Sequence, residues 1–251
     1  VGNRTSDGSQ TFSYDASDLL TNPGYSYDAN GNLTSDGTTS YSYDAANRLR
    51  QTVRDGVTTD YRYDGRGNLV RESIGVLTTD YVLDEQASLV QVLGAIRSDG
   101  TTVRYAYGPE GVTAQQTITG LGTQPLFYPL LDAQGSLRHH TDSTGGSTLQ
   151  RSFDLFGIER FRSGTADTLL GYTGAIQGEA DQTVYLRART YQPALGRFLQ
   201  RDTFEGYQSR PQSLNRYVYA ANNPFTWVDP SGFDPCYLIP IAGGAMCGAQ
   251  D

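Results

Sequence analysis

With 251 residues, the chain is long enough for one large β domain or two ordinary ones, so it can bury a substantial core. A net charge of −8 argues against a nucleic-acid partner, because neutralising phosphates requires a basic face. No apolar run approaches the ~18 residues that a membrane-spanning helix needs. The 18 tyrosines and 29 glycines favour strands joined by tight turns over helices. The chain begins at Val1 with a polar, turn-like stretch and is expected to be an interior or processed piece of a longer product.

From residue 12 onward the sequence repeats a short unit. Each copy has an aromatic residue, a variable residue, Tyr-Asp, a loop of small and polar residues, and then Leu. The four clear copies are FSYDASDLL (12–20), YSYDANGNL (25–33), YSYDAANRL (41–49) and YRYDGRGNL (61–69). Four degenerate copies follow at 81–89, 105–113, 128–137 and 151–159.

Each unit predicts a β-hairpin. The alternation of the two aromatic residues places both rings on one face of a strand. The Asp and the loop after it supply the turn, and Leu begins the returning strand. Asp-Gly pairs between the units, such as 36–37 and 55–56, predict the turns at the opposite edge. A hairpin cannot bury a face alone, so the units must add laterally. The sequence therefore predicts an all-β fold in which antiparallel hairpins form a curled ribbon.

Few of the remaining residues before Leu170 suggest chemistry. His139 and His140 are adjacent on a predicted strand and point to opposite faces, so we do not expect them to form a site. No metal-ligand spacing is present, and no cofactor is expected. Cys236 and Cys247 are the only cysteines, and the sequence leaves open whether they form a local disulfide or two isolated thiols.

The character of the sequence changes after about Leu170. Asp229-Pro230-Ser231-Gly232 predicts a strong β-turn, because Asp caps such turns, Pro fixes φ at the second position and Gly suits the last. Residues 222–224 predict another turn, so residues 225–228 are expected to form a short β-prone run between two bends. Three blocks stand in this region: YLRARTYQPALGRFLQRD, LNRYVYAANNP and DPSG.

The hairpin units resemble the YD repeats of the Rhs family, which includes bacterial polymorphic toxins, the C subunits of insecticidal toxin complexes and the animal teneurins. The three C-terminal blocks resemble the Rhs-associated core of that family. The resemblance implies a hollow β shell, and eight units are too few to close one. We therefore expect a partial shell, with a YD-repeat region at 1–165, an Rhs-associated core plug at 166–233 and a short tail at 234–251.

The resemblance also implies self-cleavage by an aspartic-type autopeptidase within the core. Asp202 and Asp229 match the two aspartates, the bond after Phe233 matches the cleaved bond, and Arg201 is expected to orient Asp202. Pro230 and Gly232 complete the motif, and Phe233 stands where Leu is usual. Two adjacent carboxyl groups in a dry site suit this chemistry, because one can hold a proton while the other activates water.

Several expectations accompany this hypothesis. Phe225 and Trp227 are predicted to provide the dry surroundings, whereas Arg187, Arg189 and Arg197 are expected to pair with carboxylates of the shell. Turn capping is the alternative role of each aspartate. The eighteen residues after Phe233 are too few for a toxin domain and are expected to lie inside the shell.

Two functions remain open. The first is a secreted shell whose partner is its own C-terminal segment or a released toxin. The second is a non-catalytic structural or adhesive protein at the cell surface. That protein would bind neighbouring copies through edge strands, or cell-surface glycans through tyrosine faces.

Overall fold

The computed structural model describes residues 2–109, 111–209, 211–233, 236–239 and 244–246. Within these residues the regular structure is β-strand, apart from three short 3₁₀ segments: η1 (Tyr172–Gly174), η2 (Pro211–Leu214) and η3 (Ala220–Asn222). The all-β prediction is confirmed.

The first part of the chain is one continuous antiparallel sheet in which each strand pairs with the next along the sequence. Its eleven strands are β1 (Tyr25–Tyr27), β2 (Leu33–Asp36), β3 (Thr39–Tyr43), β4 (Leu49–Arg54), β5 (Val57–Tyr63), β6 (Leu69–Ile74), β7 (Leu77–Asp84), β8 (Gln91–Arg97), β9 (Thr102–Gly108), β10 (Gly111–Thr119) and β11 (Gly122–Thr123). A four-stranded sheet follows: β12 (Tyr128–Leu131), β13 (Leu137–Thr141), β14 (Ser147–Phe153) and β15 (Glu159–Gly164). An antiparallel bridge between Gln115 and Phe127 joins the two sheets, so the ribbon continues across them.

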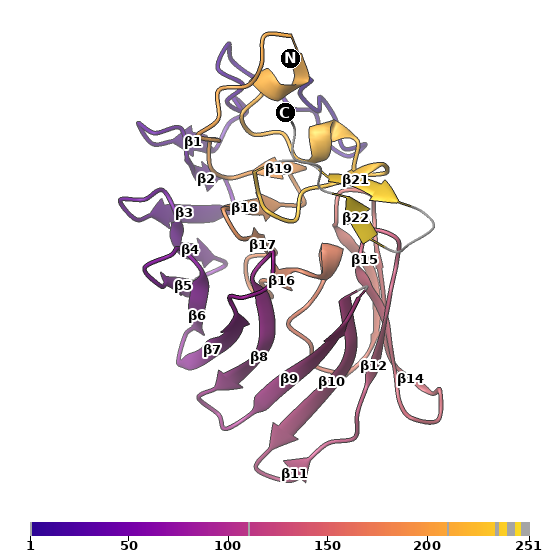
Figure 1. The fold of residues 1–251 in the computed structure, drawn as a ribbon. Coiled ribbons are helices and arrows are strands. Elements are labelled where there is room, and N and C mark those ends of the chain that lie inside the picture. Colours follow the sequence, from indigo (N-terminus) through magenta and orange to yellow (C-terminus); the bar gives the residue numbers. More distant parts are fainter. Residues whose placement is uncertain (1, 110, 210, 234–235, 240–243, 247–251) are drawn as a thin grey trace.

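The ribbon curls around the C-terminal part of the chain. In Figure 1 the strands descend on the left from β1, turn at the bottom around β11 and rise on the right through β12–β15. A second four-stranded sheet lies inside the curl: β16 (Ile176–Gln177), β17 (Val184–Leu186), β18 (Arg189–Gln192) and β19 (Arg197–Phe198). A last sheet contains β20 (Trp227–Val228), β21 (Cys236–Ile239) and β22 (Gly244–Met246).

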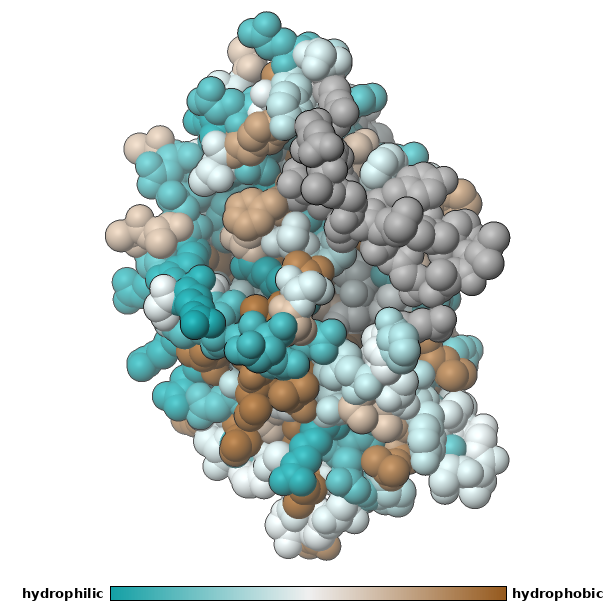
Figure 2. All heavy atoms as spheres, viewed as in Figure 1, coloured by the Kyte–Doolittle hydropathy of each residue, from teal (hydrophilic) through white to brown (hydrophobic). Residues whose placement is uncertain are grey.

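Three of the four clear repeat units bury both the first aromatic ring and the leucine, and in the unit at 25–33 Tyr25 is half-buried. Tyr41 is 4% exposed and Leu49 is 1% exposed, and the same two positions are buried in the next unit. The second aromatic ring is half-buried and packs against the same core, as the sequence predicts. Leu169, Leu195 and Leu199 complete this core from the inner segment. Figure 2 shows apolar side chains gathered in the lower middle of the visible face, between more polar margins.

The tyrosine hydroxyl groups find different partners at the two positions. Those of the first position donate to buried or half-buried carboxyl groups, namely Tyr41 to Asp36 Oδ2 at 2.7 Å, Tyr61 to Asp181 Oδ2, and Tyr81 to Glu72 Oε2 at 2.7 Å. Those of the second position donate to backbone carbonyls of an earlier strand or turn, for example Tyr43 to Leu33 at 2.7 Å and Tyr63 to Leu49 at 2.8 Å. Because a buried hydroxyl needs a partner, this arrangement satisfies both rows.

In six of the eight units, and in the turn after β13, an aspartate caps the hairpin turn. Its Oδ1 accepts the backbone N–H groups of the residues two and four positions later, an Asx-type turn. Seven aspartates do this: Asp15, Asp28, Asp44, Asp64, Asp132, Asp142 and Asp154. At the opposite edge the turn glycines Gly37, Gly56 and Gly100 adopt positive φ, as the Asp-Gly pairs predict.

Replacing Asp64 with alanine is expected to lower the free energy of unfolding by about 1–2 kcal/mol, because two turn N–H groups lose their acceptor. Chemical denaturation measures the loss. Asp64→Asn keeps the acceptor oxygen and serves as the control, with a smaller loss. Equal losses for both variants would show that the charge, and not the capping geometry, stabilises the turn.

Two local predictions need correction. In the fifth unit the returning strand begins at Gln91 rather than at Leu89, because a longer connection over residues 85–90 replaces the short turn. The run at 225–228 is a strand only at Trp227–Val228, since Phe225 and Thr226 belong to the preceding turn. Cys247 and the side chain of Cys236 lie outside the described residues, so the disulfide question stays open.

The C-terminal loops return to the start of the chain. Asn215 Nδ2 donates to Asn3 Oδ1 at 2.7 Å, and Asn222 Nδ2 donates to the carbonyl of Gly2. The Tyr217 hydroxyl donates to the carbonyl of Gly31 at 2.6 Å. The C-terminal loops are therefore held in place by contacts with the N-terminal residues.

Candidate functional site

Three segments of the C-terminal region converge on one buried side chain, Arg189. Arg189 begins strand β18, Asp202 follows strand β19 and Asp229 follows strand β20. The backbone of Asp202 is fixed by Arg216, whose Nε donates to the Asp202 carbonyl at 2.7 Å and whose carbonyl accepts the Asp202 N–H at 2.9 Å. Asp229 opens the turn through Gly232. Sheet pairing and turn formation thus bring distant residues to one place.

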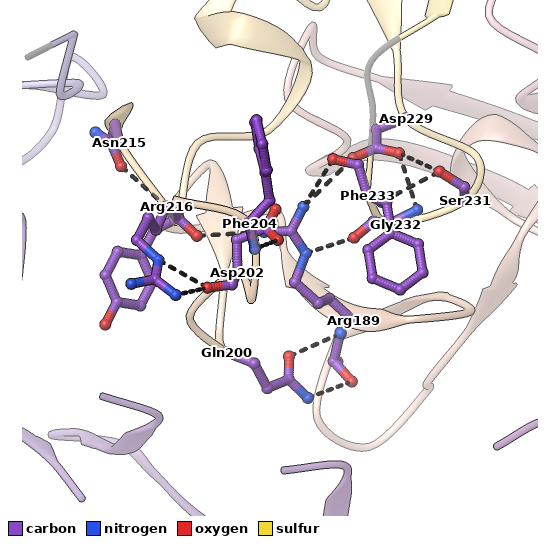
Figure 3. Close-up of polar contacts among 12 residues, drawn as sticks. Arg189, Gln200, Asp202, Phe204, Asn215, Arg216, Asp229, Ser231, Gly232 and Phe233 are labelled. Carbon is purple, nitrogen blue, oxygen red and sulfur yellow. Dashed lines mark hydrogen bonds and ion pairs between the residues drawn. The ribbon is translucent and has the colours of Figure 1, made fainter. Parts of the chain in front are cut away.

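The guanidinium group of Arg189 lies between the two carboxyl groups (Figure 3). Its Nη1 is 2.8 Å from Asp202 Oδ2, and its Nη2 is 3.7 Å from Asp229 Oδ2. All three side chains are buried, with Asp229 only 2% exposed. The guanidinium carbon also lies 3.8 Å from the centre of the Phe198 ring. Arg189 therefore supplies one positive charge to two buried acidic groups.

The same guanidinium binds backbone carbonyls next to the predicted cleavage position. Arg189 Nε donates to the carbonyl of Gly232, and Nη2 donates to the carbonyl of Phe233 at 3.3 Å. A cationic donor on a carbonyl oxygen stabilises the negative charge that develops there when a nucleophile attacks. Arg189 is therefore a candidate for that role at the bond after Phe233.

Each aspartate divides its two oxygens between two tasks. Asp202 Oδ1 accepts the backbone N–H of Phe204 at 2.8 Å, while Oδ2 faces Arg189. Asp229 Oδ1 accepts the N–H of Gly232 at 2.8 Å and the hydroxyl of Ser231 at 3.1 Å, while Oδ2 again faces Arg189. Turn capping and a place at the site, which the sequence presents as alternatives, therefore coexist on different oxygens.

A cavity of about 350 Å³ opens beside this cluster. Asp202, Asp229 and Arg189 form part of its wall, and Phe204, Tyr207 and Trp227 contribute aromatic surface. Phe225 does not line it and is 76% exposed, so the prediction that Phe225 shields the site is wrong. Phe225 lies within the turn at 223–226, before β20 begins.

The arginine predictions also change. Among the described residues, the ion pair to Asp202 comes from Arg189, whereas Arg201 is exposed and its side chain lies near Gly31. Adjacency along the chain gives the orienting role to Arg201, whereas the sequence places Arg189 only among the arginines expected to pair with shell carboxylates, so the position of Arg189 at the site is missed. The sequence signal that could have identified Arg189 is its position at the start of a strand, directly after a two-residue hairpin turn. Its neighbours along the chain give no such signal.

The other two core arginines do not pair with carboxylates in the described part of the chain. Arg187 donates to backbone carbonyls of Val90 and Pro230. Arg197 donates to the Asp18 carbonyl at 2.6 Å and stacks on the Tyr14 and Tyr217 rings. The prediction of ion pairs is therefore wrong for both, and Arg189 pairs with two carboxyl groups of the core rather than with carboxylates of the shell.

The two histidines do not form a catalytic or metal-binding site among the described residues. His140 is fully buried and stacks on Phe127, with ring centres 5.9 Å apart, and burial lowers the pKa of its imidazole to about 4. His139 is half-buried on the other face, as predicted. The described residues contain no cluster of His, Cys, Asp or Glu suited to a metal ion. They also contain no helix of sufficient length and apolar character to cross a membrane.

Comparison with known proteins shows which family has this architecture. The family model "Teneurin YD-shell" matches residues 3–225, most of the chain, and ends just before Asp229. The tRNA nuclease WapA of Bacillus subtilis strain 168 is 32% identical over 245 residues, which is 92% of this chain and 9% of the relative. The tRNA3(Ser)-specific nuclease WapA of Bacillus spizizenii is 31% identical with the same coverage. The chain thus spans about a tenth of these relatives.

Solved structures share the fold. The TcdB2-TccC3 crystal structure superposes with a TM-score of 0.58 at 19% identity, covering 82% of this chain and 11% of that one. A Tc holotoxin pore of Photorhabdus luminescens gives a TM-score of 0.53 at 17% identity, covering 90% of this chain and 15% of that one. Fold and repeats together define an open antiparallel YD shell. The chain belongs to the teneurin YD-shell family, within the Rhs-type YD-repeat proteins, and shares its fold with the TccC3-containing structures.

Proposed function

We propose that this chain is the C-terminal part of a secreted YD-shell protein that holds its own C-terminal segment and cuts the bond after Phe233. The observation that supports the proposal is the position of Arg189, which contacts Asp202, Asp229 and the Phe233 carbonyl at once. The proposed division is a repeat region at 1–165, a core at 166–233 and a tail at 234–251.

The proposed reaction is hydrolysis of one peptide bond. Water adds to the carbonyl carbon of Phe233, and a carboxylate of Asp202 or Asp229 accepts a proton from that water. Arg189 stabilises the negative charge on the carbonyl oxygen. The proton then passes to the amide nitrogen of residue 234 as the C–N bond breaks, leaving a new carboxylate at Phe233 and a new amine. Because Arg189 lies between the carboxyl groups, the site differs from a pair of carboxyls that face each other directly.

The partner in this proposal is the segment after Phe233 or a toxin released with it. Pairing of β21 with β20 supports retention of that segment, because Trp227 and Val228 are in register with Tyr237 and Cys236. The toxin-shell relatives support a secreted or cell-surface location. Neighbouring copies and cell-surface glycans remain partners of the alternative function, a structural or adhesive surface protein.

Asp229→Asn is expected to abolish the proposed cleavage of the chain. Intact mass spectrometry of the purified product should show a wild-type fragment ending at Phe233 and a single uncut species for the variant. Asp202→Asn should behave in the same way, since both carboxyl groups contact Arg189.

Asp132→Asn is the matched control, because Asp132 also caps a turn and contacts an arginine, Arg138, but lies outside the site. This variant should cleave at the wild-type rate. An uncut wild-type chain would remove the peptidase function and leave the structural alternative.

A further inference from the structure

The turn between β17 and β18 contacts four successive carbonyl groups of the segment that precedes the proposed cut. Each carbonyl receives a donor from residues 187–189, in matching order. The pairs are Arg187 Nη1 to Pro230, the Ala188 N–H to Ser231 at 3.1 Å, Arg189 Nε to Gly232, and Arg189 Nη2 to Phe233 at 3.3 Å. The two segments therefore fit together in one register, and a shift by one residue would leave each donor without its present acceptor.

Arg187 occupies an unfavourable position to make its contact. It is the first residue of a two-residue hairpin loop and has φ of 62°, a left-handed conformation in which glycine is usual. The Arg187 side chain is half-buried, and the loss of solvation lowers the pKa of its guanidinium group. Within the described residues its partners are carbonyl oxygens and not carboxylates. A half-buried cation without a carboxylate partner loses part of its solvation, and its hydrogen bonds offset that cost.

Those hydrogen bonds join the ribbon to the turn. Arg187 Nε and Nη2 donate to the Val90 carbonyl at 3.0 and 2.8 Å, and Nη1 donates to the Pro230 carbonyl. Val90 directly precedes strand β8 of the ribbon. Arg187 therefore ties the position of Pro230 to the ribbon as well as to the local turn.

Gly232 closes the contact from the other side. It has φ of 73°, and a Cβ atom there would collide with the Leu186 carbonyl and lie 2.9 Å from the Arg189 nitrogen. The 229–232 turn therefore packs directly, backbone against backbone, on the β17–β18 turn.

We propose that the β17–β18 turn selects the bond to be cut, and that Arg187 is the positioning residue that sets the register. The inference rests on the proposed self-cleavage after Phe233. Arg187 acts through the turn, since it touches Pro230 and Arg189 touches the reacting carbonyl. Without Arg187, residues 230–233 should no longer be held in one register. Peptide bonds other than the one after Phe233 should then reach the cluster of Arg189, Asp202 and Asp229.

The first test compares the wild-type chain with Arg187→Met. Cleavage in the variant should be at least tenfold slower, and intact mass spectrometry should find several product ends around Phe233 instead of one. Arg187→Lys keeps a charge but cannot span both carbonyls, so it should resemble Arg187→Met. Arg54→Met is the matched control, because Arg54 also caps an internal carbonyl, that of Asp181, but lies away from the turn. A single end at Phe233 formed at the wild-type rate would overturn the inference.

A second measurement separates this inference from the proposed function. In an Asp202→Asn background, which should not cleave, Arg187→Met should accelerate hydrogen exchange in peptides covering residues 227–233 at least tenfold. Gly232→Ala disturbs the same contact from the opposite side and should have the same effect if Arg187→Met does not fold. Unchanged exchange overturns the inference whatever the wild-type chain does. Absence of wild-type cleavage with accelerated exchange in the variant would overturn only the peptidase function.

Discussion

Replacing Arg189 with lysine should slow cleavage after Phe233 by about 10²–10³-fold, the loss typical of removing one donor to a developing oxyanion. A lysine ammonium is a point charge and cannot reproduce the planar set of donors with which Arg189 contacts Asp202 and the Phe233 carbonyl together. The rate of appearance of the fragment ending at Phe233, followed by intact mass spectrometry after refolding, measures this effect.

Arg197→Lys is the control for the loss of a buried, ring-stacked arginine. Arg197 lies over Tyr14 and Tyr217 and contacts neither aspartate of the site in the described structure. It should cleave at the wild-type rate once folded, as judged by circular dichroism. Equal slowing in both lysine variants would show that general destabilisation, and not the contact of Arg189 with the carbonyl, controls the rate.

The second large effect concerns stability and lies in the ribbon. Glu72 is 9% exposed and accepts a hydrogen bond from the Tyr81 hydroxyl at 2.7 Å. Burial raises the pKa of Glu72 to about 7 from an ordinary value of 4.5, and the nearby Asp181 and Glu179 add to the rise, whereas Tyr81 and Arg97 oppose it. The folded chain therefore binds a proton that the unfolded chain has released, so stability falls as the pH rises from about 4.5 to about 7.

Glu72→Gln removes this dependence while keeping an oxygen for Tyr81. Relative to wild type, the variant should gain about 3 kcal/mol in the free energy of unfolding between pH 4.5 and pH 8, with little difference at the acidic end. Urea denaturation at several pH values measures the gain. Glu85→Gln, a residue at the ribbon surface paired with Arg66, is the control and should follow the wild-type curve. Parallel curves for Glu72→Gln and wild type would show that Glu72 does not titrate in this range.

The ribbon could be predicted from the sequence because its determinants are local. Tyr41 and Tyr43 face one side by strand geometry, and Asp44 caps a turn formed by the next few residues. The fifth unit departs from the prediction where its turn residues depart from the pattern, so the longer connection before Gln91 is also a local effect.

The site could be predicted only in part, because its contacts join residues that lie far apart in the sequence. Asp202 and Asp229 carry recognisable motifs, and the structure brings both to one guanidinium. That guanidinium belongs to Arg189 because β18 packs against the 229–232 turn, which is a tertiary contact. Arg201 was favoured only by its position next to Asp202. The exposure of Phe225 likewise follows from how a turn is oriented and not from its composition.

The order of the strands has a consequence for when the site can form. Strands β1–β11 pair only with their sequence neighbours, so the ribbon can grow one hairpin at a time as the chain emerges. The surroundings of Asp202 instead require partners far back in the chain, as in the contacts of Asn215 with Asn3 and of Tyr217 with Gly31. Such long-range closure is expected late in folding, because its entropic cost is recovered only when the intervening chain is ordered. Assembly of Arg189, Asp202 and Asp229 is therefore expected only after the ribbon has folded, so the proposed cleavage should require the folded chain and should not occur in a half-synthesised one.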